Sequence, residues 1–175
     1  RIKQLGAAYL TYPGAEHSRF SHMLGTMHVA GRIVERLKGM GYLTEDEGQK
    51  VRIAALLHDV GHGPFSHLFE DALYRRRGIT HEDLTQLIIR ESVLGEVLGE
   101  QGYSPLEVSK LCVGRLEKAE PYLNQVVASQ FDADVMDFLV RDSYFTGVDY
   151  GRVDINRLID SMDVLGGNLA IDVAA

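Results

Sequence analysis

The chain has 175 residues, of which 45% are hydrophobic and 25% charged, and its formal net charge is −7. These values are typical of one globular domain and exclude an intrinsically disordered or fibrous protein. The negative charge disfavours binding to nucleic acid, and no apolar run approaches the roughly 20 residues that span a bilayer, so we expect neither partner. The single cysteine, Cys112, excludes an internal disulfide framework and favours a reducing, cytoplasmic setting.

Helical patterns dominate the chain. Apolar residues recur at helical spacing over about 18–38, and Gly39 and Gly41 predict the end of this helix. Three later helix starts carry a Ser or Thr with an acidic residue three positions on, the capping-box pattern: Thr44–Glu47, Thr80–Asp83 and Ser104–Glu107. Further helices are predicted at about 65–76, 81–98, 105–117, 121–145 and 154–163. A short β-hairpin is predicted around Gly166 and Gly167, so the fold class is mainly α.

The histidines are unevenly distributed, because all seven lie at or before His81. Clustered imidazoles point first to metal or proton chemistry. His58 projects from the face that Val51 and Ala54 bury, and Asp59 follows about 100° further round the helix. Since glycines turn the chain directly afterwards, both side chains can converge on one ion, and this donor pair suits Fe, Mn, Zn or Ni. The alternative is a hydrogen-bonded core histidine beside a capping aspartate.

A later helix is predicted to carry a face with both acidic and basic residues. Asp134, Phe138 and Arg141 share this face, and Asp142 lies within reach of it. Burying such a face is costly unless the charges are paired or bind a ligand. An ion pair between Asp137 and Arg141 on successive turns is the alternative to a ligand site.

His22, His58–Asp59 and Asp134 match, in this order, the H…HD…D signature. The sequence resembles the HD-domain metal-dependent phosphohydrolases, and within them the deoxynucleoside-triphosphate triphosphohydrolase (dNTPase) branch. The resemblance runs over most of residues 2–160, and other segments carry it too: Gln4-Leu5-Gly6, Tyr12-Pro13-Gly14-Ala15, 17–22, 58–67, Thr80-His81-Glu82 and 134–152. It implies a single HD domain over 1–175, folded as a helical bundle around a metal site. This domain would be the catalytic core of a longer protein, with 166–175 starting a truncated C-terminal region.

The same resemblance implies roles for individual residues. One divalent ion, Fe, Mn, Zn or Ni, would be held by four ligands: His22, His58, Asp59 and Asp134. Additional Mg would accompany the substrate. The catalytic residues, which would face the α-phosphate or relay protons, are His62, His67, Glu70 and His81, with Glu70 paired to His81. The substrate-binding residues are Arg19 for phosphate and three residues around the deoxyribose: Gln4, Leu5 and Asp142.

The implied activity is metal-dependent hydrolysis of deoxynucleoside triphosphates to deoxynucleoside and triphosphate, by water attack on the α-phosphate, in a homo-oligomer. Two positions depart from the family. Val135 and Phe138 stand where relatives carry a basic residue and often a tyrosine that help to hold the substrate. The alternatives are therefore an HD phosphohydrolase acting on a monophosphate, a cyclic dinucleotide or (p)ppGpp, or a nucleotide-sensing module with weak or no turnover. His17 and His28 are predicted to be surface or packing residues.

Overall fold

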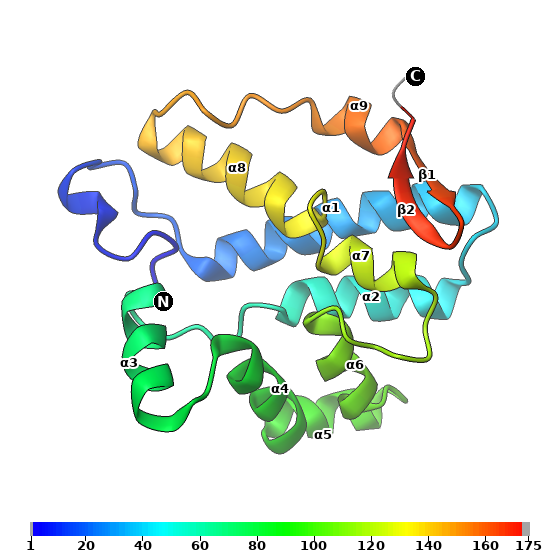
Figure 1. Cartoon of the computed structure of the whole chain (residues 1–175), viewed down its shortest axis with the longest axis horizontal. Helices are drawn as coiled ribbons and strands as arrows, with labels where there is room; N and C mark the ends of the chain where they lie inside the picture. Colours follow the sequence, from blue (N-terminus) through cyan, green and yellow to red (C-terminus); the bar gives the residue numbers. More distant parts are fainter. Residues whose placement is uncertain (1, 173–175) are drawn as a thin grey trace.

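The computed structural model describes residues 2–172, except for the side chain of His67. Within that range the chain forms nine α-helices, a short 3-10 turn (η1, Ala8–Leu10) and one two-stranded antiparallel sheet near the C-terminal end (Figure 1). The prediction of a mainly α fold with a short C-terminal hairpin is confirmed.

Two long helices form the centre of the molecule. Helix α1 (Arg19–Gly39) begins after Ser18, whose hydroxyl accepts a hydrogen bond from the backbone of Ser21. Helix α2 (Glu45–Leu57) begins with the complete capping box of Thr44 and Glu47 that the sequence predicts. Helix α1 packs against both α2 and α8 (Ala133–Thr146). The buried side chains of these three helices include five that are at most 2% exposed: Ile33, Leu37, Val51, Ala54 and Met136. Each large apolar side chain buried here contributes about 1.5–3 kcal/mol, so these helices form a firm frame.

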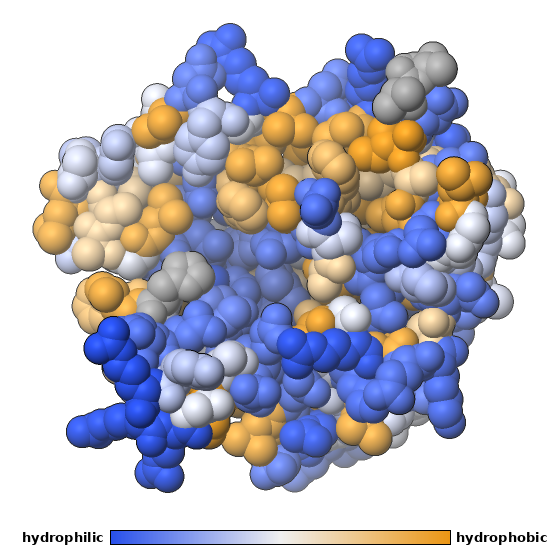
Figure 2. Space-filling view, viewed as in Figure 1, coloured by the Kyte–Doolittle hydropathy of each residue, from blue (hydrophilic) through white to orange (hydrophobic). Residues whose placement is uncertain are grey.

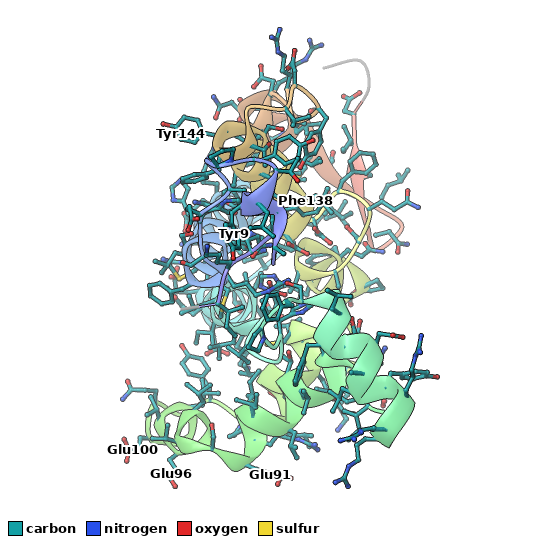
Figure 3. All side chains as sticks on the ribbon, turned by 90° about the vertical axis from the view of Figure 1, so that its left-hand side faces the viewer. Tyr9, Glu91, Glu96, Glu100, Phe138 and Tyr144 are labelled. Atoms are coloured by element: carbon teal, nitrogen blue, oxygen red, sulfur yellow. The ribbon has the colours of Figure 1, made fainter. Side chains whose placement is uncertain are left out.

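Four helices form the other half of the molecule: α3 (His67–Arg77), α4 (His81–Glu91), α5 (Val93–Glu100) and α6 (Pro105–Cys112) (Figure 1). Helix α4 packs against α5 and α6, and α6 packs against α2. The exposed side chains of Glu91, Glu96 and Glu100 lie at the end of this half that is farthest from α8 (Figure 3). Their negative charges therefore lie on the outer surface, away from α8.

Two of the predicted helices are each divided in two. The predicted helix 81–98 is interrupted at Ser92, which has an extended backbone and accepts a hydrogen bond from the backbone of Leu94. The predicted helix 121–145 consists of α7 (Pro121–Val127) and α8. Asp132 caps α8 by accepting from Val135, and it also accepts from the backbone of Ser129. Both breaks arise because a short polar side chain satisfies backbone N–H groups that a continuous helix would use.

Two other predicted helices are longer than the helices that the structure forms. The predicted helix 105–117 ends at Cys112, shortly before Gly114, whose φ of +67° is left-handed. The predicted helix 154–163 corresponds to α9 (Ile155–Asp160). The last two residues of the prediction, Met162 and Asp163, lie instead in strand β1 (Met162–Leu165). Strand β1 pairs with β2 (Asn168–Ile171), and both turn residues between them have positive φ, which glycine adopts without strain. Residues 173–175 of the expected C-terminal region lie outside the described residues.

The surface is hollowed between the two halves of the molecule. Hydrophilic side chains gather in this hollow, whereas apolar side chains cover much of the face above it (Figure 2). The residues that line the hollow come from the N-terminal segment, the end of α2, the start of α4 and helix α8. Parts of the chain that are distant in sequence therefore share one cavity.

Candidate metal centre and active-site pocket

The packing of α1 against α2 and α8 brings the four predicted metal ligands together. His22 lies on α1, His58 ends α2, Asp59 follows it, and Asp134 lies in the first turn of α8. Ligand atoms of His22, His58 and Asp59 all lie within 4.8 Å of one another. The Oδ1 atom of Asp134 lies 2.9 Å from His22 Nε2 and 3.6 Å from His58 Nε2. This cluster could hold a divalent metal ion.

The orientation of both imidazoles fits a metal. Nδ1 of His58 donates to the carbonyl oxygen of Ala55 at 2.8 Å, and Nδ1 of His22 lies 2.8 Å from Asp137 Oδ2. The buried Nε2 atoms of both rings point into the cluster and make no well-aligned hydrogen bond within residues 2–172. Two imidazole nitrogens backed by hydrogen bonds from their other ring atoms, together with carboxylate oxygens, are the donor set that transition metals prefer.

The electrostatics of the cluster favour positive charge. Burial opposes the charged form of His22, but the nearby carboxylates of Asp134 and Asp137 outweigh it and raise its pKa to about 9. Burial also opposes ionisation of Asp59, yet the charges of His58 and Arg19 lower the pKa of this carboxyl. The cluster thus stabilises protons on His22 and His58, and a divalent cation would replace that positive charge.

Asp137 supports the cluster, a role the sequence did not reveal. The predicted ion pair with Arg141 is confirmed, with Nε and Nη2 of the arginine 2.7 and 2.8 Å from the two carboxylate oxygens. The same carboxylate also holds His22. A Cβ atom on Gly25 would lie 1.9 Å from Asp137 Oδ1, so glycine at this position leaves room for the carboxylate against α1. The three-residue spacing of Asp134 and Asp137 was the available signal, because it places both on one face.

The predicted acid–base residues adjoin the cluster. Nδ1 of His81 is hydrogen-bonded to Glu70, and the ring of His81 stacks on His62 with centroids 4.0 Å apart. Nε2 of His62 lies 3.4 Å from Asp59 Oδ1. Burial, with the nearby charges of Arg19 and His81, lowers the pKa of His62 to about 4, although Asp59 opposes this shift. His62 is therefore uncharged at neutral pH.

His67 begins α3, but its side chain lies outside the described residues, so its predicted role stays a prediction.

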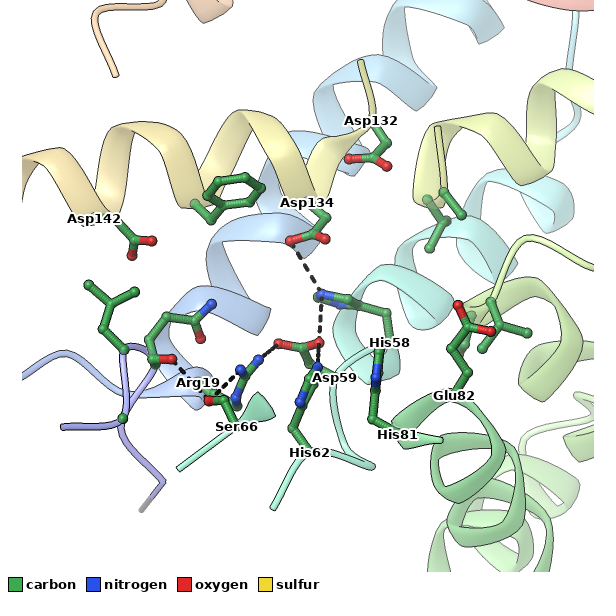
Figure 4. Close-up of a pocket in the computed structure, with 18 of the residues that line it drawn as sticks. Arg19, His58, Asp59, His62, Ser66, His81, Glu82, Asp132, Asp134 and Asp142 are labelled. Atoms are coloured by element: carbon green, nitrogen blue, oxygen red, sulfur yellow. Dashed lines mark hydrogen bonds and ion pairs between the residues drawn. The ribbon is translucent and has the colours of Figure 1, made fainter. Parts of the chain in front are cut away.

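One pocket of about 740 Å³ connects these groups with the predicted substrate residues (Figure 4). Its walls include all four residues predicted to bind substrate, together with metal-cluster and acid–base side chains: Gln4, Leu5, Arg19, Asp142, His58, Asp59, Asp134, His62 and His81. Phe138 also lines it, whereas Val135 is not among its lining residues. Glu70 is not among the lining residues, but it is hydrogen-bonded to His81, which is. The arrangement can therefore place a ligand that is anionic at one end beside the metal cluster.

Ser66 is a lining residue that sequence reasoning missed. Its hydroxyl accepts from Arg19 Nη2 at 2.7 Å and donates to the backbone oxygen of Gln4 at 3.2 Å, while Nη1 of Arg19 donates to Asp59. The backbone at Phe65 and Ser66 has φ values of +64° and +51°, which cost energy for residues with a side chain. Such strain is often found at functional sites, and here it places Ser66 between the arginine and the N-terminal segment.

His17 is a packing residue, one of the two alternatives that the sequence predicted for it. It is 5% exposed, and its Nε2 lies 2.6 Å from Asp142 Oδ1. His28, predicted in the same way, is exposed on α1. The two differ because the segment before α1 folds against α8, whereas His28 lies on an outer face.

Residues 19–139 match the HD domain family, which is more than half of the chain. The chain belongs to the HD-domain phosphohydrolase family. It is 34% identical to a phosphohydrolase of known structure from Bacteroides thetaiotaomicron, with a TM-score of 0.83 over 98% of this chain and 41% of that one. A protein of known structure from Aquifex aeolicus is 40% identical, with a TM-score of 0.85 over 99% of this chain and 46% of that one.

Curated relatives place this HD domain near the dNTPase branch. The uncharacterised Bacillus subtilis protein YwfO is 42% identical over 93% of this chain and 37% of its own length. A Dictyostelium discoideum homologue of the deoxynucleoside triphosphate triphosphohydrolase SAMHD1 is 35% identical over 91% of this chain and 34% of its own length. The chain thus spans little more than a third of these relatives. No helix within residues 2–172 is long and apolar enough to cross a membrane.

Proposed function

We propose that this HD domain hydrolyses deoxynucleoside triphosphates to deoxynucleoside and inorganic triphosphate by water attack on the α-phosphate. One observation carries the proposal: a single pocket joins the His22–His58–Asp59 cluster and Arg19 to the predicted sugar-binding residues Gln4, Leu5 and Asp142. The similarity to dNTP triphosphohydrolases supports this choice of substrate.

The metal ligands in this proposal are His22, His58, Asp59 and Asp134. A divalent ion held there, Fe, Mn, Zn or Ni, would polarise a phosphoryl oxygen and lower the pKa of a bound water. Arg19 adds positive charge beside the cluster, since its guanidinium is buried and its Nε has no hydrogen bond within the described residues. A guanidinium in this position suits the non-bridging oxygens of a phosphate chain. Additional Mg bound with the triphosphate remains a prediction.

The proton transfers are assigned to the histidine pair. Attack at the α-phosphorus forms a bond to the water oxygen and breaks the bond to O5′ of the deoxynucleoside, which must take up a proton. His81 is held at Nδ1 by Glu70, so its Nε2 is the atom free to exchange that proton. His62 is uncharged at neutral pH and stacks on His81, so it can accept a hydrogen bond from the attacking water. His67 completes the proposed catalytic set.

Selectivity for deoxyribose is assigned to Gln4, Leu5 and Asp142. A wall packed against C2′ would exclude the hydroxyl of a ribonucleotide, and a carboxylate accepts a hydrogen bond from the 3′-hydroxyl. We further propose that the protein acts in the cytoplasm as a homo-oligomer and binds no nucleic acid.

A nucleotide sensor with weak turnover is the second candidate. The observation that favours it is Phe138, which presents an apolar ring to the pocket where relatives often carry a tyrosine. Loss of a hydroxyl contact would weaken substrate binding without affecting the metal cluster. The two candidates differ in turnover, because a sensor would bind dNTP in the metal-loaded protein and leave it intact.

The test is a hydrolysis panel on the metal-loaded protein. Elemental analysis identifies the bound metal, and ion-exchange chromatography separates the products from four dNTPs, four NTPs, a monophosphate, a cyclic dinucleotide and ppGpp. We expect deoxynucleoside and triphosphate from dNTPs, with ¹⁸O from labelled water in the triphosphate. Orthophosphate or pyrophosphate as the sole inorganic product would contradict attack at the α-phosphate. The metal-stripped protein is the control and should be inactive.

A further inference from the structure

His17 is a buried histidine for which the proposed chemistry has no role. Its side chain is 0% exposed, and its ring stacks on Phe145 with centroids 4.6 Å apart and planes at 20°. Nε2 lies 2.6 Å from Asp142 Oδ1. Because an ionised carboxylate only accepts hydrogen bonds, Nε2 carries the hydrogen in this contact. A fully buried, charge-assisted hydrogen bond of this kind is strong and directional.

The partner of His17 is a residue of the pocket wall. Asp142 lies on α8, is 4% exposed and lines the cavity that also contains the metal cluster (Figure 4). His17 holds one carboxylate oxygen, whereas the other, Oδ2, makes no hydrogen bond within residues 2–172. The carboxylate is thus fixed in rotation and keeps an acceptor for a ligand.

The backbone of His17 holds another part of the same wall. Its carbonyl oxygen accepts a hydrogen bond from the backbone of Gln4 at 3.0 Å, and the next residue, Ser18, forms a β-bridge with Lys3. Gln4 and Leu5 line the pocket with Asp142. One residue therefore contacts both structural parts of the predicted sugar site, the N-terminal segment through its backbone and α8 through its ring.

The segment before His17 has little room to move. A Cβ atom on Gly14 would lie 2.2 Å from the carbonyl oxygen of Phe145, so this segment is pressed against the last turn of α8. Ala15 is 1% exposed in the same stretch. The position of the His17 ring relative to Asp142 is therefore set by packing on both sides.

We propose that His17 is a positioning residue that fixes Asp142 relative to Gln4 and Leu5, so that the pocket recognises the 3′-hydroxyl of a deoxynucleotide. The inference rests on the proposed function. His17 acts through Asp142 and does not touch the reacting atoms. Without the Nε2 hydrogen bond, the carboxylate would rotate between orientations and lose its alignment with the sugar.

The experiment compares a dNTP with its 2′,3′-dideoxy analogue in the metal-loaded protein. His17→Phe keeps the stacking on Phe145 but removes the donor, and His17→Gln keeps an N–H near the position of Nε2. We expect His17→Phe to lower kcat/KM for the dNTP about tenfold or more, mainly through KM, the size expected for a lost hydrogen bond to a charged group. The dideoxy analogue should change less than about twofold, and His17→Gln should restore most of the difference. His28→Phe on the exposed face of α1 is the matched control.

The possible outcomes distinguish the role of His17 from the proposed dNTP hydrolysis. Equal losses for both substrates, or no loss, would overturn the role of His17 while leaving the proposed function intact. If His17→Phe does not fold, His17→Asn replaces it, because the shorter amide of asparagine cannot reach Asp142 as glutamine does. Equal kinetics of the Asn and Gln variants would then overturn the inference. A wild-type protein that hydrolyses no dNTP would overturn the proposed function, and this inference with it.

Discussion

The two sides of the pocket are built in different ways. The metal side belongs to the core: His22 is 1% exposed, Asp59 8%, and the helices that carry them are packed through fully buried apolar side chains. The opposite side includes α3, in which the structure describes no buried residue. Helix α3 also starts without a side-chain cap, after the strained turn at Phe65 and Ser66.

Because of this difference, substitutions on the two sides should have different effects, on stability and metal binding on one side and on proton transfer on the other. On the metal side, three of the four proposed ligands are each held by a further group: His22 by Asp137, His58 by the carbonyl of Ala55, and Asp59 by Arg19. Changes there should therefore affect both folding and the metal. On the α3 side, Glu70 contacts His81 from a helix that contributes little to the core, so changes there should affect proton transfer alone. Four predictions test this separation, in order of decreasing effect on turnover.

The largest effect is expected from His58→Ala combined with Asp59→Ala. Removing two of the four proposed ligands should abolish both the bound metal and turnover, because a single imidazole and carboxylate cannot retain the ion. Elemental analysis and the dNTP assay measure the two losses. His28→Ala, an exposed histidine on α1, should retain both. Full activity in the double variant would show that the cluster is not the catalytic centre.

The next effect is expected from Glu70→Gln. Loss of the carboxylate behind His81 should lower kcat by roughly 100-fold, within the range for general acid–base catalysis. Metal content should stay the same. The free energy of unfolding should change by about 1 kcal/mol or less, because the amide of glutamine can still accept from the backbone of His81. Steady-state kinetics, elemental analysis and urea denaturation check the three values. A loss of metal or stability in parallel with kcat would refute the separation of the two sides.

A structural effect is expected from Gly25→Ala. The new Cβ would collide with the Asp137 carboxylate, so this side chain or the two helices must shift, at a cost of about 1–3 kcal/mol. Because Asp137 orients His22, metal affinity should also fall roughly tenfold or more. Urea denaturation and metal titration measure both. Gly39→Ala is the matched control at the end of the same helix, where no atom lies within 4 Å of a new Cβ, and it should be neutral or stabilising.

The last prediction concerns pH in the metal-free protein, where stability alone is measured. The pKa of His22 is about 9 in the folded state, against 6.5 as its ordinary value. The proton therefore stabilises the fold fully below about pH 6.5, and this contribution is lost as the pH rises through 9. The free energy of unfolding of chelator-treated protein should fall by up to about 3 kcal/mol over this window.

The metal-loaded protein provides the comparison for this measurement. Since a metal bound by His22 would replace a proton on its imidazole, loaded protein should show little of this decline. A metal-free protein whose stability is constant or rises between pH 6.5 and 9 would contradict the charge pairing around His22.

The sequence by itself determined the local features of this protein. Capping boxes placed the starts of α2 and α4, and the glycines after His58 and Asp59 predicted a turn that brings both side chains to one ion. The resemblance to HD-domain phosphohydrolases supplied His22 and Asp134, whose proximity the fold then established. These predictions succeeded because caps, turns and ordered motifs are encoded within a few residues of each other or in a known family pattern.

Only the tertiary structure decided which side chains support the site. Asp137 binds His22 across 115 residues, and His17 binds Asp142 across 125. The breaks at Ser92 and Asp132 also escaped the helical pattern, because each depends on which backbone groups a polar side chain satisfies once the helices have packed. Helix periodicity shows which face is apolar, but it contains no information about the partner that a buried charge meets. That partner is fixed by the close approach of α1 and α8, which the folded core imposes.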